Sequence, residues 1–106
     1  MTSTLVQQKN VSAASAYTEY SFIIPARAKE VTLNLRSGNQ PVYWYLVTTN
    51  GSTPGSSSNL PQSPNTYNTI PAGASRTMNG MLDAQTIYFQ TPGASQVLEV
   101  DYYVDS

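Results

Sequence analysis

Proline and glycine divide this sequence into short runs in which apolar and polar residues alternate. In the clearest run, residues 30–36, Val31, Leu33 and Leu35 would face a core while the residues between them face solvent. No stretch sustains the helical period of 3.6 residues. Short alternating runs between turn residues are typical of β-sandwiches and barrels. The sequence therefore predicts an all-β fold, an antiparallel β-sandwich of seven or eight strands, with a jelly-roll-like topology as one candidate.

The runs are predicted to be strands of one domain over residues 1–106, because a chain of this length fits a single domain. The first run could be an edge strand, or residues 1–12 could form an extended arm. Asn79-Gly80 is a strong hairpin signal, although it could instead mark a bulge. The predicted strands cover residues 4–11, 17–24, 30–36, 41–49, 67–70, 75–82, 85–91 and 96–104. The residues predicted to form the core are Phe22, Ile24, Val31, Leu33, Leu35, Trp44, Leu46, Ile87, Phe89, Leu98 and Val100.

Three predicted turns resemble one another in composition. Residues 24–28, 70–75 and 91–95 each place a proline just past a strand, followed by small residues. Proline ends a ladder because it has no N–H, and small residues allow a tight corner. We interpret this similarity as recurrent turn chemistry rather than as an internal repeat.

The chain carries few charges. Only 10% of its residues are charged and its net charge is −1, whereas globular proteins average about 25% charged residues. Such a surface has little self-repulsion and suits a protein that packs against others. The five basic residues form no dense cluster, so we expect no nucleic-acid binding. No apolar run approaches the ~20 residues of a membrane span, and no secretion signal follows Met1, so we expect synthesis in a cytoplasm and no membrane association.

The residue types that most often carry out catalysis are missing. The sequence has no cysteine and no histidine, so its serines and threonines have no imidazole to activate them. Glu99 and Asp101 alternate onto one face of a predicted strand about 7 Å apart, and we interpret them as a solvated face that discourages edge pairing. Nothing resembles an ordered calcium loop. We therefore expect no enzyme activity, no cofactor and no metal site.

The predicted strand over residues 41–49 is apolar on both faces. One face would carry Val42, Trp44 and Leu46, and the other Tyr43, Tyr45 and Val47. Three interpretations remain open: a strand buried on both sides or bent between sheets, a protein–protein contact in which tyrosine is favoured, or a platform that stacks on sugar rings as in a carbohydrate-binding module.

A long polar segment over residues 50–66 follows, with three prolines, two glycines and five serines in its sequence NGSTPGSSSNLPQSPNT. Loops beyond about 12–15 residues are usually functional or disordered, so we expect this segment and the N-terminal segment to take part in contacts with other proteins. The residues predicted to lie in a protein interface are Leu5, Val6, Tyr43, Tyr45, Leu60, Pro61 and Tyr67.

The second half of the chain resembles a pattern in small structural proteins of tailed bacteriophages. The matching pieces, in order, are residues 70–73 (IPAG), 86–89 (TIYF), 94–95 (AS) and 96–103 (QVLEVDYY). The resemblance implies a β-sandwich in the virion, such as a capsid decoration or cement protein without catalytic residues. It also implies the major capsid protein or other virion proteins as partners, and a homo-oligomer, with a trimer favoured. Two alternatives remain: a tail or head–tail adaptor or fibre protein, and a carbohydrate-binding module in host recognition.

Overall fold

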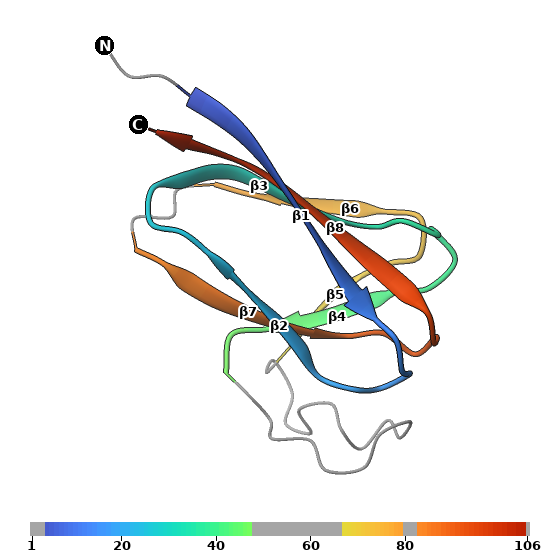
Figure 1. The fold of residues 1–106 in the computed structure, drawn as a ribbon. Coiled ribbons are helices and arrows are strands. Elements are labelled where there is room, and N and C mark those ends of the chain that lie inside the picture. The colour runs from blue at the N-terminus through green and yellow to red at the C-terminus, as the bar shows by residue number, and fades with distance from the viewer. Residues whose placement is uncertain (1–3, 48–66, 80–82, 106) are drawn as a thin grey trace.

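Eight strands and no helix make up the described part of the chain, residues 4–47, 67–79 and 83–105 of a computed structural model (Figure 1). The number of strands agrees with the prediction of seven or eight. The strands are β1 Thr4–Ala13, β2 Tyr20–Ile24, β3 Ala28–Leu35, β4 Val42–Tyr45, β5 Asn68–Ile70, β6 Ser75–Met78, β7 Gln85–Gln90 and β8 Gln96–Asp105.

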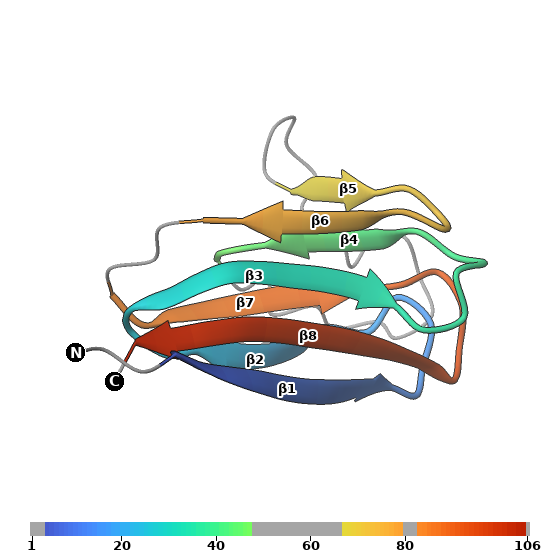
Figure 2. The ribbon, with the colours of Figure 1, turned by 90° about the horizontal axis from the view of Figure 1, so that it is seen from above.

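The strands form two antiparallel sheets that pack face to face (Figures 1 and 2). Sheet 1 has the order β1-β8-β3-β6 and sheet 2 has the order β2-β7-β4-β5. The first strand thus pairs with the last, the second with the seventh, the third with the sixth and the fourth with the fifth. This nested pairing is the topology of a jelly roll. It confirms the predicted antiparallel β-sandwich and its jelly-roll-like form.

Nearly every connection crosses from one sheet to the other, and the crossing turns share one backbone feature. A residue with positive φ lies in each of the described turns after β1, β2, β3, β5 and β7. Glycine occupies this position in only two of them. The three predicted turns of similar composition thus each turn the chain from one sheet to the other. This agrees with recurrent turn chemistry as the reason for their similarity. The residues with positive φ are Tyr17, Arg27, Gly38, Gly73 and Ser95.

The core lies between the sheets and consists of the inward-facing residues of both. Ten of the eleven residues predicted for it are buried. The exception is Leu46, which is 49% exposed, because β4 ends at Tyr45 and the alternation does not continue beyond it. Further buried residues that join the core are Ala13, Ala28, Val42, Ile70 and Tyr102.

Residues 4–13 form an edge strand rather than a free arm. Strand β1 pairs with β8 along its whole length, from Thr4 opposite Asp105 to Ala13 opposite Gln96. The prediction of an extended arm is therefore wrong for residues 4–12, and the alternative of an edge strand is confirmed. The Nζ atom of Lys9 donates a hydrogen bond to the backbone oxygen of Ile23, 3.2 Å away, and so joins the edges of the two sheets.

One irregularity interrupts the pairing of β3 with β8. Lys29 lies opposite Tyr103 and Thr32 opposite Asp101, so that Glu30 and Val31 together face a single residue of β8. This two-against-one pairing is a β-bulge. Glu30 has a φ of 50°, which is the left-handed conformation that such bulges place at their first position. The predicted hairpin at Asn79-Gly80 falls partly outside the described residues, and the flanking strands β6 and β7 belong to different sheets and do not pair.

Candidate functional site

Three tyrosines gather on the outer face of sheet 2, and we call them the tyrosine cluster. Tyr43 lies on β4, Tyr67 directly precedes β5, and Tyr17 lies in the turn before β2. The Tyr17 and Tyr43 ring centroids are 6.5 Å apart with an interplanar angle of 11°, and the Tyr67 ring meets Tyr43 edge-on at 5.6 Å. All three side chains are half-buried. Two of them, Tyr43 and Tyr67, were predicted as contact residues, and the structure brings these two together.

The surroundings of Tyr43 disfavour the charged form of its phenol. Burial raises the pKa of the Tyr43 phenol, and the neighbouring Tyr17 and Tyr67 raise that pKa further. Burial acts in this direction because it penalises the charged phenolate. The Tyr43 phenol is therefore uncharged at neutral pH. The cluster offers apolar ring surface and hydroxyl groups that can both donate and accept hydrogen bonds.

Tyr45 does not belong to the exposed surface, which corrects its prediction as a contact residue. Its side chain is 1% exposed. The hydroxyl donates to Oε1 of Glu19 at 2.9 Å and accepts from Nε2 of Gln90 at 2.7 Å. Its ring stacks on Tyr88 with a centroid distance of 6.0 Å and an angle of 14°. The interpretation of a strand buried on both sides is thus correct at Tyr45 but not at Tyr43.

Three large apolar side chains are exposed at the end of sheet 2 away from the tyrosine cluster. Ile23 is 56% exposed, and Leu46 and Val47 are 49% and 77% exposed. Ile23 lies on β2 opposite Thr86 of β7. Tyr43 lies opposite Gln90, four residues further along the same strand. Leu46 and Val47 directly follow β4. Ile23 was not predicted as a contact residue, although its neighbours Phe22 and Ile24 face the core and the alternation therefore turns it outward.

The remaining predicted contact residues fall into two pairs. Leu5 and Val6 are on β1, paired with Val104 and Tyr103, and therefore belong to sheet 1. Leu60 and Pro61 lie outside the described residues. Among the described residues, the predicted interface is thus divided between the two sheets.

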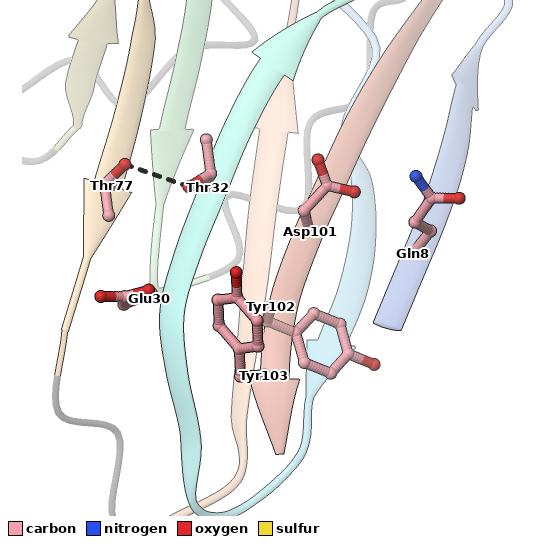
Figure 3. A pocket seen from close by; sticks show the side chains of 7 residues that line it. All are labelled: Gln8, Glu30, Thr32, Thr77, Asp101, Tyr102 and Tyr103. Carbon is pink, nitrogen blue, oxygen red and sulfur yellow. Dashed lines mark hydrogen bonds between the residues drawn. The ribbon is translucent and has the colours of Figure 1, made fainter. Parts of the chain in front are cut away.

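The outer face of sheet 1 has a different character, since it is polar and acidic. It contains an open pocket of about 520 Å³ to which all four strands of sheet 1 contribute (Figure 3). The hydroxyls of Thr32 and Thr77 are 3.0 Å apart across β3 and β6. The residues that line the pocket are Gln8, Glu30, Thr32, Thr77, Asp101, Tyr102 and Tyr103.

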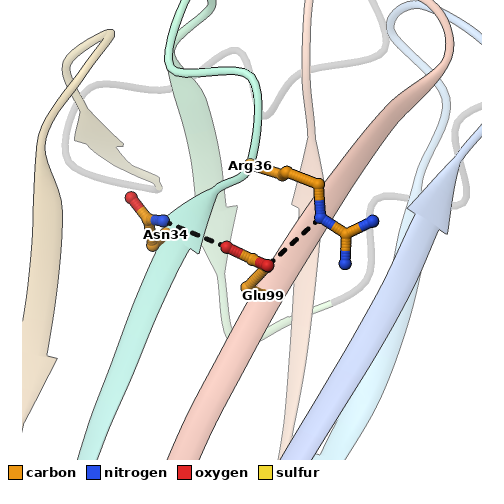
Figure 4. A network of polar contacts seen from close by, with 3 residues as sticks. All are labelled: Asn34, Arg36 and Glu99. Atoms are coloured by element: carbon orange, nitrogen blue, oxygen red, sulfur yellow. Dashed lines mark hydrogen bonds and ion pairs between the residues drawn. The ribbon is translucent and has the colours of Figure 1, made fainter.

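A small polar network lies next to this pocket on the same face (Figure 4). Glu99 accepts a hydrogen bond from Nδ2 of Asn34 at 3.3 Å, and its other oxygen forms an ion pair with Nε of Arg36 at 3.1 Å. Glu99 and Asp101 share one face, as predicted. However, β8 is an interior strand between β1 and β3, so the interpretation that these carboxylates discourage edge pairing is wrong.

Three further findings concern the class of protein. Among residues 4–47, 67–79 and 83–105, no three acidic, histidine or cysteine side chains lie close enough together to hold a metal ion. The same residues include no helix long and apolar enough to cross a membrane. A scan against models of known protein families gives no match, and a search of curated protein sequences finds no significant similarity.

Proposed function

We propose that this protein is a structural component of a virion that docks on other virion subunits through the outer face of sheet 2. The observation that carries the proposal is the chemistry of this region, where the tyrosine cluster and the exposed Ile23, Leu46 and Val47 lie on the strands of sheet 2 or directly beside them. Tyrosine is enriched in protein interfaces because it buries much area while few rotamers are lost.

The charge of this face supports docking by desolvation rather than by ion pairs. Glu19 lies in the turn before β2, two residues from Tyr17, and its carboxylate accepts a hydrogen bond from the buried Tyr45. Across the whole chain, charged residues make up 10%. Binding of such a face is expected to depend little on salt, since screening acts mainly on exposed charges.

The size of the face supports a role in which many copies act together. Its four strands have three to six residues each, so the face measures about 20 Å by 20 Å from the usual strand spacing and rise. This area of about 400 Å² is half of the ~800 Å² that each partner buries in a stable complex. One docked copy would therefore bind weakly, whereas copies joined to one another and repeated over a shell would bind by avidity.

The particular role that we propose is a capsid decoration or cement protein that binds across capsomers, stabilises the head and forms a homo-oligomer, with a trimer favoured. This choice depends on the resemblance of residues 70–73 and 96–103 to phage structural proteins. A jelly roll by itself hosts many functions. A tail or head–tail adaptor or fibre protein is the alternative within the virion.

Copy number separates these roles. Quantitative mass spectrometry of purified virions that contain this chain should give a copy number comparable to that of the major capsid protein. A number that matches one ring of the tail would instead favour the adaptor.

A docking assay tests the surface itself. Tyr43→Ser and Tyr67→Ser proteins should co-sediment with capsids lacking this chain much less than wild type does, while Tyr103→Ser on the opposite sheet should co-sediment normally. Equal binding by all three variants, or no binding by wild type to heads or tails, would rule out the proposal.

A further inference from the structure

The pocket on sheet 1 is built from groups that can hydrogen-bond in both directions. Thr32 and Thr77 supply hydroxyls, Gln8 supplies an amide, and Glu30 and Asp101 supply carboxylates (Figure 3). Within the described part of the chain, neither of the two carboxylates has a hydrogen bond or an ion pair. These oxygens are therefore ready to accept hydrogen bonds from a ligand.

The charges around the pocket select against anions. None of its seven lining residues is basic. Arg36, on the same face, is already paired with Glu99, and Lys29, which precedes Glu30 on β3, has an interaction of its own. A ligand that carried a carboxylate or phosphate would meet Glu30 and Asp101 well within one Debye length of about 8 Å, so repulsion would weaken its binding.

The pocket also combines donors with acceptors, which suits a ligand that carries both. The hydroxyls of Thr32 and Thr77 and the amide of Gln8 can donate as well as accept. A lysine or arginine side chain has no acceptor for those donors. By contrast, each hydroxyl of a sugar both donates and accepts, and Tyr103, which is 36% exposed, offers ring surface to the sugar C–H groups.

We propose that this pocket binds a neutral pyranose unit of a glycan. Its volume of about 520 Å³ falls within the range of about 300–1,000 Å³ for small-molecule sites. The inference does not depend on the virion role. The two roles are compatible, because the outer faces of the two sheets point in opposite directions (Figure 1), and a copy docked through sheet 2 leaves the pocket open.

The bulge in β3 provides a variant that separates binding from folding. Glu30 has a positive φ of 50°, a conformation that glycine adopts without the Cβ clash that other residues incur. Glu30→Gly therefore removes one carboxylate from the pocket while leaving the bulge favourable. Asp101→Asn is the complementary variant, since it removes a charge and keeps the shape of an exposed side chain.

The test is a backbone amide NMR titration of the full chain with methyl glycosides of neutral hexoses and N-acetylhexosamines, and with methyl glucuronide as the anionic comparison. We expect at least one neutral glycoside to shift the amides of Thr32, Thr77, Asp101 and Tyr103, and methyl glucuronide to shift none of them. Asp101→Asn and Glu30→Gly should each weaken binding by about tenfold or more, because each removes a charged acceptor, while Tyr43→Ser should bind as wild type does.

Each other outcome overturns the inference. One is the absence of any response to the neutral glycosides at their solubility limits. Another is a response confined to the tyrosine cluster, which would move sugar binding to sheet 2. A third is unchanged affinity in both carboxylate variants when thermal unfolding shows them to be folded. The first and third results would leave docking through sheet 2 untouched, whereas the second would favour the sugar-platform interpretation of the tyrosine cluster.

Discussion

Removing the hydroxyl of Tyr45 should destabilise the fold far more than the loss of one surface atom would. The hydroxyl joins Glu19 at 2.9 Å and Gln90 at 2.7 Å, and Gln90 is 0% exposed. In Tyr45→Phe the ring remains, so no large cavity forms. The Gln90 amide, however, loses this acceptor where water cannot replace it.

The magnitude follows from the two bonds. Loss of a partner at a buried polar group costs about 1–3 kcal/mol, and loss of a hydrogen bond to a carboxylate adds about 1 kcal/mol or more. The free energy of unfolding should therefore fall by about 2–4 kcal/mol. This is a large part of the ~5–15 kcal/mol that stabilises a domain of this size, and it should lower Tm by about 10 °C or more.

The assay is urea unfolding followed by the fluorescence of Trp44. It is the single tryptophan of the chain and is 6% exposed in the fold, so its emission reports loss of the core. Tyr88→Phe is the matched control, because this ring stacks on Tyr45 and its hydroxyl has no hydrogen bond among the described residues. The urea midpoint should fall in Tyr45→Phe with an unchanged slope, and should barely move in the control. A loss of less than about 0.5 kcal/mol in Tyr45→Phe, equal to that of the control, would refute this account of the buried hydroxyl.

Three further predictions concern pH, corners and the polar network. The folded state holds the pKa of Tyr43 above its unfolded value near 10, so Tyr43 loses its proton in the unfolded chain first. The contribution of this residue to stability is therefore lost as pH rises from about 10 through the folded pKa. Urea unfolding at increasing pH should show a steeper loss in wild type than in Tyr43→Phe, and parallel curves would contradict the assigned burial. At the corners between sheets, Gly73→Ala should lower the free energy of unfolding by about 1–2 kcal/mol, because φ is 80° there. Ser95→Gly, at a φ of 56°, should leave that free energy unchanged or raise it by up to about 1 kcal/mol. Thermal unfolding that ranks the two variants in reverse would exclude backbone strain at these positions. Glu99→Gln should cost less than about 1 kcal/mol in the same assay, because the side chains of its ion pair with Arg36 are 34% and 54% exposed, and a larger cost would mean that the network supports the sheet.

Most of the fold could be predicted from the sequence because β-strand alternation is a local signal. In β3 and β8, Val31, Leu33, Leu98 and Val100 alternate with polar residues and are buried. The pairing of β1 with β8 could not be predicted, since nothing local indicates that strands more than eighty residues apart in the chain will meet. Leu46 was placed wrongly because alternation alone does not show where a strand ends.

The candidate surfaces could be predicted only in part. The apolar character of both faces of residues 42–47 correctly indicated an unusual strand, but the sequence could not show that Tyr45 is covered while Tyr43 is half-exposed. The sheet 1 pocket escaped prediction, because its residues come from four strands that are distant in the chain. The bulge at Glu30 also gave no signal, since bulges of this kind usually place glycine there.

Hydroxyl-radical footprinting of the free protein and of intact virions that contain it shows whether sheet 2 is the docked face. We expect oxidation of Tyr43, Tyr67 and Ile23 to fall sharply in the particle, while Tyr103 on the opposite sheet is oxidised as in the free protein. Unchanged oxidation of the three sheet 2 residues, together with protection of Tyr103, would place the docked surface on sheet 1 and contradict the account.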